Sequence, residues 1–321
     1  MRALITGGCG FIGSHLATVL LQRGDKVDVL DNLSTGTIDN VEHLEKHSNF
    51  SMTIGSVMDT QAVSRLTRKA DVVFHLAAVV GVDLVIANPL CTIETSVVGT
   101  KNILRCAAKQ RTPVLLASSS EVYGNASRLP SAESDTLALG RTACPRWSYA
   151  FSKAIDEALA FAYHSERGLP LVVARLFNTV GPRQTGRYGM VLPRFVRRAL
   201  SGDPLLVYGD GRQTRSFTHV DDTVRMLVAL MDEPKAHGDV FNVGSSQQVQ
   251  IIELAKLVRS RANSASEIQL IPYTEAHPEG FAEIKHRVPD TSKATSLTRI
   301  HPSMEIRAIV DSVIAWATTG E

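Results

Sequence analysis

Tyr149 and Lys153 are four positions apart, and their residue types and spacing suit proton transfer from an alcohol. Residues at i and i+4 share one face of a helix, so the lysine ammonium is expected beside the phenol. A neighbouring cation favours the phenolate and lowers the tyrosine pKa towards neutrality. A phenolate can then remove a hydroxyl proton while hydride leaves the carbon that bears it. The pair predicts the oxidation of an alcohol.

Hydroxyl and carboxylate side chains follow a predicted strand shortly before this pair. The apolar run 114–117 ends in Ser118-Ser119-Ser120-Glu121. Parallel strands present such side chains to ligands at the carboxyl edge of a sheet. Since the spacing Tyr-x-x-x-Lys is common by chance, this placement carries the prediction. The predicted catalytic residues are Ser119, Ser120, Glu121, Tyr149 and Lys153.

A glycine-rich turn near the first residue predicts a dinucleotide site. The first strand leads into Gly7, Gly10 and Gly13, and an apolar helix continues over 15–21. Without side chains, glycines let the backbone approach a pyrophosphate, which the helix amides and dipole then hold. The second strand ends at Asp31, whose carboxylate can accept from both hydroxyls of an adenine ribose and repels a 2′-phosphate. The expected cofactor is therefore NAD rather than NADP.

Short apolar strands alternate with amphipathic helices in the first half of the chain, which favours a parallel sheet with helices on both faces. The predicted strands are 3–5, 27–30, 71–76, 113–117 and 171–176, and further helices are expected at 192–200 and 251–261. Glycine and proline mark loops at 181–182, 209–211 and 278–280. We predict an α/β fold, a Rossmann-type doubly wound parallel sheet with a smaller C-terminal α/β substrate-binding lobe.

The 321 residues are enough for one large domain and a smaller one. We assign 1–175 to a Rossmann domain that binds NAD and 176–321 mainly to the substrate-binding lobe. A segment near 216–240 is expected to return to the sheet.

Composition argues against several kinds of partner. The formal net charge is +2 without a basic block, so no nucleic-acid partner is expected. Four cysteines lack metal-ligand spacing, which predicts reduced thiols and no metal. The first residues read as a strand rather than a signal peptide, and no apolar run reaches the length of a membrane span. We expect a soluble cytoplasmic protein with no membrane partner.

Three further polar residues are expected to be structural. His75 ends a buried strand, where a histidine with satisfied hydrogen bonds is more common than a ligand. Asp221 and Asp222 open a predicted helix and are interpreted as its N-cap and first-turn acid.

Several motifs follow one another along nearly the whole chain. They are Thr6-Gly7-Gly8-x-Gly10-Phe11-Ile12-Gly13, Asp31-Asn32-Leu33-Ser34-Thr35-Gly36, His75-Leu76-Ala77-Ala78, Tyr149-x-x-x-Lys153, Arg175-Leu176-Phe177-Asn178-x-x-Gly181-Pro182-Arg183, Val207-Tyr208-Gly209-Asp210-Gly211-x-Gln213-Thr214-Arg215-Ser216-Phe217 and Val220-Asp221-Asp222. In this order they resemble the extended short-chain dehydrogenases/reductases that act on nucleotide sugars. That group contains sugar 4-epimerases, 4,6-dehydratases and glucuronate decarboxylases.

The resemblance implies tightly bound NAD, a UDP- or dTDP-sugar in the second lobe, with UDP favoured, and often a homodimer built through a four-helix contact. Tyr149 would be the base at the sugar 4-hydroxyl, Ser119 would hydrogen-bond that oxygen, and Lys153 would also hold the nicotinamide ribose. The implied cofactor-binding residues are Gly7, Gly10, Phe11, Ile12, Gly13, Asp31, Asn32, Ser34, Thr35, Gly36, Leu76, Ala77, Ala78, Tyr149 and Lys153. The implied substrate-binding residues are Asn178, Val191, Val207, Tyr208, Gln213, Arg215 and Arg287. Ser56 and Ser96 depart from the usual aspartate and asparagine, so the adenine contacts stay open.

All branches of this group begin with oxidation at C4, and the next residues select the outcome. Glu121 matches a dehydratase glutamate that removes the C5 proton, but Ser120 stands where an aspartate protonates the departing 6-hydroxyl, and serine is too weak an acid for that role. We predict dehydration across C5 and C6 with hydride returned to C4, for example from UDP-N-acetylglucosamine to a 5,6-ene, a reaction of antibiotic biosynthesis. The alternatives are a UDP-sugar 4-epimerase and a UDP-glucuronate decarboxylase, which also has Ser-Glu at this point. Outside enzymes, the alternative is an NAD-sensing regulator.

Overall fold

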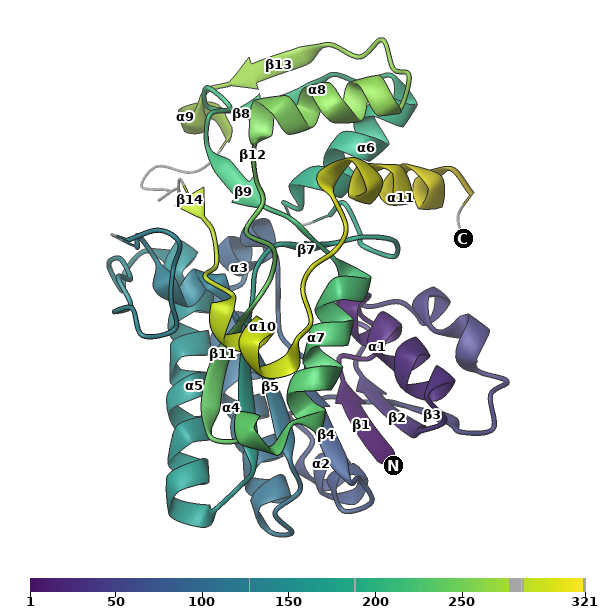
Figure 1. Ribbon diagram of the computed structural model, residues 1–321, viewed down its shortest axis with the longest axis vertical. Coiled ribbons are helices and arrows are strands. Elements are labelled where there is room, and N and C mark those ends of the chain that lie inside the picture. The colour runs from purple at the N-terminus through teal and green to yellow at the C-terminus, as the bar shows by residue number, and fades with distance from the viewer. Residues whose placement is uncertain (127, 188, 277–283, 285, 320–321) are drawn as a thin grey trace.

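A seven-stranded parallel sheet forms the centre of the larger part of the molecule (Figure 1). The computed structural model describes residues 1–319 except 127, 188, 277–283 and 285. The strand order is β11-β6-β5-β4-β1-β2-β3, so the chain runs outwards from β1 in both directions. The bounds are β1 (Arg2–Thr6), β2 (Lys26–Asp31), β3 (Phe50–Ile54), β4 (Val72–His75), β5 (Val114–Ser119), β6 (Leu171–Leu176) and β11 (Asp239–Val243). Such an order places a ligand site where it reverses, beyond the carboxyl ends of β1 and β4.

Helices cover both faces of this sheet (Figure 1). One face packs on α1 (Phe11–Gln22), α7 (Val220–Asp232) and α10 (Ser292–Thr298). The other packs on α2 (Thr60–Thr67), α4 (Pro89–Ala108) and α5 (Ser148–Arg167). Since neighbouring strand residues point to opposite faces, Ile5 joins the first buried cluster and Leu4 the second. This doubly wound arrangement confirms the predicted Rossmann-type α/β fold.

The second lobe lies over the carboxyl edge of the sheet and has its own buried core (Figure 1). Phe195, Leu254 and Ile309 bring three of its helices together in that core. The helices are α6 (Val191–Ser201), α8 (Ile251–Arg261), α9 (Tyr273–Ala276) and α11 (Ile306–Thr319). The strands are β8 (Leu205–Tyr208) with β13 (Ile268–Ile271), and β9 (Thr214–Ser216) with β12 (Gln248–Gln250) and β14 (His286–Arg287). Smaller elements are α3 (Val82–Ala87) and the pair β7 (Thr179–Val180) and β10 (Thr218–His219).

Elements with strong apolar patterns were predictable, whereas the edge strand β3 and the short strands of the second lobe were not. The helix predicted at 251–261 has those bounds in α8. β3 escaped prediction because its side chains are half-buried or exposed, with Ile54 62% exposed. After α7 the chain returns to the sheet as β11, beside β6. The domain boundary at 175 stays a prediction, and the loop predicted at 278–280 lies outside the described residues.

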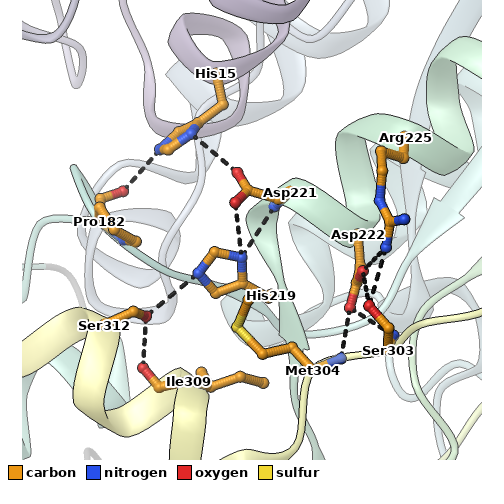
Figure 2. A network of polar contacts seen from close by, with 10 residues as sticks. All are labelled: His15, Pro182, His219, Asp221, Asp222, Arg225, Ser303, Met304, Ile309 and Ser312. Atoms are coloured by element: carbon orange, nitrogen blue, oxygen red, sulfur yellow. Dashed lines mark hydrogen bonds and ion pairs between the residues drawn. The ribbon is translucent and has the colours of Figure 1, made fainter.

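A polar network fastens α1 to α7 and α11 (Figure 2). His15 Nε2 lies 3.1 Å from the carbonyl oxygen of Pro182, and its Nδ1 lies 3.5 Å from Oδ1 of Asp221. His219 Nδ1 accepts from the amide of Asp221 at 3.2 Å, and its Nε2 lies 3.2 Å from Ser312 Oγ. The loop after β7 is thereby held against the first helix of the chain.

Asp222 has a structural role in the same region (Figure 2). Its buried carboxylate accepts from the amides of Ser303 at 2.9 Å and Met304 at 3.1 Å, and it pairs with Arg225. Burial opposes its ionisation, but these partners lower its pKa. Asp221 and Asp222 both lie in the first turn of α7, and the N-cap is His219 rather than an aspartate. The N-cap prediction is wrong because the histidine ring accepts the amide bond instead.

The four cysteines form no disulfide. Burial raises the pKa of Cys9 in the glycine turn to about 12, so this thiol is inert. Across the part of the chain that the structure describes, no helix is both long and apolar enough to cross a membrane. No group of metal-ligating side chains gathers among those residues either.

Candidate active site

A cavity of about 1190 Å³ follows the carboxyl edge of the sheet and extends beneath the second lobe. All five predicted catalytic residues line it. The predicted cofactor residues line it except Gly36, and the predicted substrate residues line it except Val207. The Val207 side chain is fully buried in the core of the second lobe, because alternate residues of β8 point away from the cavity.

The glycine turn forms one end of the cavity. Gly7 has φ of 73°, and a Cβ there would lie 2.9 Å from the amide nitrogen of Ala77. A Cβ on Gly13 would lie 2.2 Å from the carbonyl oxygen of Gly7, so only glycine fits. Gly10 precedes α1 without a side-chain cap, and the first helix amides stay open to an anion. Gly36 packs against the backbone of Cys9 and supports the turn from behind.

Asp31 is fixed beside this turn. Its Oδ2 accepts from the amide of Cys9 at 2.9 Å, and its Oδ1 accepts from the amide of Leu33 at 2.8 Å. The carboxylate stands at the carboxyl end of β2 and lines the cavity. The glycine turn and Asp31 together fit NAD, with the pyrophosphate at the first turn of α1 and the adenine ribose at Asp31.

Tyr149 and Lys153 lie in the first turns of α5, opposite the end of β5. Burial raises the pKa of Tyr149, and the charges of Glu121 and Asp156 raise it further, whereas a hydrogen bond with Ser119 acts the other way. The lowered pKa of Tyr149 that its spacing to Lys153 predicted is therefore wrong for the protein without bound ligands. The reason is that burial outweighs any effect of the neighbouring cation, whose ammonium donates to the carbonyl oxygen of Ala117 at 2.9 Å and lies 3.4 Å from Asp156.

Glu121 is held between two arginines. Its Oε1 lies 3.0 Å from Nη2 of Arg146 and 2.8 Å from Nη2 of Arg287, and Oε2 also contacts Arg146. Burial alone would favour the neutral acid, but Arg287 and Arg146 lower the pKa of Glu121 to about 2. Arg146 was missed because nothing in its surroundings resembles a binding motif. It is brought in by the short 3-10 helix Pro145–Trp147, which directly precedes α5.

The predicted substrate residues line the part of the cavity under the second lobe. Asn178 donates from Nδ2 to the carbonyl oxygen of Ser216 at 2.8 Å, and Gln213 donates to that of Tyr208 at 2.9 Å. Arg194, which was not predicted, donates to the Tyr208 hydroxyl at 2.8 Å and stacks 4.5 Å from its ring centre. An aromatic ring and several amides at this end suit a nucleobase and a diphosphate.

His75 is a core residue, as predicted. Its Nδ1 lies 2.7 Å from Thr6 Oγ1 and its Nε2 lies 3.1 Å from Thr100 Oγ1. Burial and the charge of Lys153 lower its pKa to about 3, so the ring is neutral.

Comparison with known proteins agrees with this geometry. The family model described as GDP-mannose 4,6 dehydratase matches residues 4–313. A UDP-N-acetyl-alpha-D-glucosaminuronate decarboxylase of Bacillus cytotoxicus is 42% identical over 98% of this chain and 97% of its own. UDP-glucuronic acid decarboxylase 1 of Xenopus tropicalis is 35% identical over 98% of this chain and 72% of its own.

Solved structures extend the comparison. The UDP-glucuronic acid 4-epimerase of Bacillus cereus, in complex with UDP-glucuronic acid and NAD, superimposes with a TM-score of 0.89 at 27% identity over 100% of both chains. The dTDP-glucose 4,6-dehydratase DesIV of Streptomyces venezuelae, with NAD bound, has a TM-score of 0.89 at 28% identity over 99% of this chain and 98% of its own. The chain therefore belongs to the GDP-mannose 4,6-dehydratase family, among the extended short-chain dehydrogenases/reductases that use NAD to epimerise, dehydrate or decarboxylate nucleotide sugars.

Proposed function

We propose that this protein is an NAD-dependent decarboxylase of a UDP-linked hexuronate. The observation that carries the proposal is the Glu121 carboxylate between Arg146 and Arg287. With a pKa of about 2, Glu121 is ionised at neutral pH and is a poor base for a carbon-bound proton. Decarboxylation needs no base at C5, and two guanidinium groups in the cavity suit a substrate that carries a carboxylate.

The chemistry of the sugar explains why so little is required of the protein. Oxidation at C4 makes the C6 carboxylate a β-keto acid. The C5–C6 bond then breaks, carbon dioxide leaves, and the electron pair moves into an enolate over C5, C4 and the C4 oxygen. The enolate takes up a proton from solvent at C5, in place of the lost carboxyl carbon, and return of the hydride to the ketone at C4 gives the UDP-pentose.

The residues of the cavity have separate tasks in this scheme. We assign the 4-hydroxyl proton to Tyr149 and a hydrogen bond on the same oxygen to Ser119, whose hydroxyl contacts the phenol. NAD, when bound, would accept the hydride from C4 and later return it. Arg287, 14% exposed against 4% for Arg146, is the arginine that we assign to the substrate carboxylate.

The relatives support the substrate class. The Bacillus cytotoxicus relative is a UDP-N-acetylglucosaminuronate decarboxylase by name, and it matches this chain over nearly its whole length. Further relatives, at 35–37% identity, are UDP-glucuronic acid decarboxylases by name. We therefore infer UDP-N-acetylglucosaminuronate as the first substrate to test and UDP-glucuronate as the second.

The 5,6-dehydratase predicted from the sequence is the second candidate. Its support is the pair Ser120-Glu121 on the cavity wall beside Ser119. Glu121 would have to remove the C5 proton, and its arginine partners oppose that role by stabilising the carboxylate. A place in antibiotic biosynthesis and a cytoplasmic location stay predictions.

A panel of UDP-N-acetylglucosaminuronate, UDP-glucuronate and UDP-N-acetylglucosamine, with product mass as the measurement, tests the proposal. We expect loss of carbon dioxide from a uronate and no reaction in Tyr149→Phe. Loss of water from UDP-N-acetylglucosamine would instead establish the dehydratase. An unchanged mass with a new C4 epimer would establish an epimerase.

We also propose a homodimer through α4 and α5. Leu90, Ile93 and Val98 on α4 and Ile155 on α5 are 39–67% exposed, and the two helices pack side by side (Figure 1). Large apolar side chains exposed on neighbouring helices are typical of an interface. Light scattering that gives the monomer mass at working concentrations would contradict the dimer.

A further inference from the structure

Asp156 is a buried carboxylate beside Tyr149 and Lys153, and the proposed reaction gives it no role. It lies on α5 three residues after Lys153, and no part of its side chain reaches solvent. The next residue, Glu157, is also buried but has an evident structural role, since it pairs with Arg175 and accepts from Ser118. Asp156 has no arginine of this kind among the described residues.

The contacts of Asp156 are few and lead directly to Lys153. Its Oδ2 accepts from the Ser96 hydroxyl in α4 at 2.6 Å and lies 3.4 Å from the Lys153 ammonium. Its Oδ1 is buried without a hydrogen-bond partner. A buried charge with so few partners is weakly screened, so its field acts strongly on the nearest ionisable groups.

The other groups around Lys153 cannot replace Asp156. From β4, His75 is neutral, with a pKa lowered by burial to about 3. From β5, the carbonyl oxygen of Ala117 accepts from the ammonium at 2.9 Å. Glu121 acts on Tyr149 from the opposite side but is itself bound by Arg146 and Arg287. Within the described part of the chain, Asp156 is the one carboxylate that forms an ion pair with Lys153.

We propose that Asp156, oriented by Ser96, is a positioning residue that holds the Lys153 ammonium and thereby sets how readily Tyr149 gives up its proton. The inference rests on the proposed role of Tyr149 as the base at the 4-hydroxyl. Two effects act in the same direction. The carboxylate repels a developing phenolate on Tyr149. Its ion pair also holds the Lys153 ammonium towards Asp156, which weakens the support that this cation can give to a phenolate. Both effects oppose loss of the Tyr149 proton.

Removing the charge should therefore move this ionisation to lower pH. We expect Asp156→Asn, which keeps the shape, to lower the apparent pKa of Tyr149 by about one unit or more. In the NAD-bound enzyme, the Cζ resonance of ¹³C-labelled tyrosine reports this titration directly, and Tyr149→Phe assigns the signal. The acid limb of kcat/KM should move by the same amount.

Asp222→Asn is the matched control, because Asp222 is another buried, ion-paired aspartate that lies outside the cavity lining. It should lower thermal stability and leave the Tyr149 titration unchanged. If Asp156→Asn does not fold, Asp156→Ser removes the same charge with a smaller polar side chain.

The results separate the inference from the proposed function. An unmoved Tyr149 resonance in folded Asp156→Asn would overturn the inference, even if turnover depends on Tyr149. A shifted resonance without turnover of any UDP-sugar would support the inference while the proposed function fails. Failure of both Asp156 variants to fold, where Asp222→Asn folds, would make Asp156 a purely structural residue and also overturn it.

Discussion

Nη2 of Arg287 lies 2.8 Å from Oε1 of Glu121, so an arginine expected to bind substrate already binds a carboxylate of the protein. The two residues come from β14 in the second lobe and from the short 3-10 helix after β5. The contact joins the two lobes inside the cavity, and the proposal places the C6 substituent of the sugar beside it. In the proposed reaction, that substituent is itself a carboxylate.

Arg287→Met should lower kcat/KM for a UDP-uronate about 100-fold, because a charge-assisted hydrogen bond to the substrate carboxylate is lost. Arg212→Met is the matched control, since Arg212 is 82% exposed and outside the cavity lining. Steady-state kinetics on both variants provides the measurement. Equal kcat/KM values for Arg287→Met and wild type would remove Arg287 from the site.

Glu121→Gln should lower the free energy of unfolding by about 3 kcal/mol, because Arg146 and Arg287 keep their charges but lose their shared carboxylate. Thermal unfolding should show a loss of several degrees in Tm. Glu253→Gln, in an exposed pair with Lys256, should change Tm little. A Tm equal to wild type for Glu121→Gln would show that the ion pairs of Glu121 with Arg146 and Arg287 do not stabilise the fold.

The same carboxylate predicts a pH dependence of stability. The folded-state pKa of Glu121, about 2, lies below its value of about 4.3 in an unfolded chain. Its contribution is therefore present above pH 4.3 and is lost as the pH falls through 2. Between these values wild type should lose stability more steeply than Glu121→Gln, and parallel curves in urea titrations would contradict the assigned pKa.

Gly13→Ala should abolish NAD binding, since its Cβ would lie 2.2 Å from the carbonyl oxygen of Gly7. Gly24→Ala provides the comparison: its φ of 92° strains an alanine, but no atom lies within 4 Å of the new Cβ. That variant should lose about 1 kcal/mol of stability and still bind NAD. Fluorescence titration with NAD distinguishes the two variants. A wild-type affinity of Gly13→Ala for NAD would show that the glycine turn has room for a side chain at position 13.

Asp31→Ser should reduce the preference for NAD over NADP at least tenfold, because the carboxylate that repels a 2′-phosphate is removed. Titration of both cofactors measures the ratio. Asp31 also accepts from the amides of Cys9 and Leu33, so some loss of NAD affinity is expected as well. An unchanged ratio would show that discrimination lies elsewhere.

The cofactor end of the site was predictable because its determinants are local. Gly7, Gly10, Gly13 and the acid at the end of the second strand act through backbone conformation and chain order alone. The environment of Glu121 was not predictable in this way. Arg146 reaches it from a loop segment 25 positions away and Arg287 from another lobe, and neither contact leaves a periodic or motif signal.

The behaviour of Tyr149 shows the same limit. Its spacing to Lys153 predicted their shared helix face, but the sign of its pKa shift depends on burial, Glu121 and Asp156. Burial and the positions of these two charges result from tertiary packing, which the spacing in the sequence does not contain.

The proposed reaction removes C6 of the sugar as carbon dioxide. The most direct test incubates the NAD-bound protein with UDP-N-acetylglucosaminuronate labelled with ¹³C at the carboxyl carbon and follows the label by mass spectrometry. We expect stoichiometric release of labelled carbon dioxide with formation of a UDP-linked N-acetylated pentose. Label that stays in the nucleotide sugar, together with loss of water from UDP-N-acetylglucosamine in a parallel incubation, would contradict it.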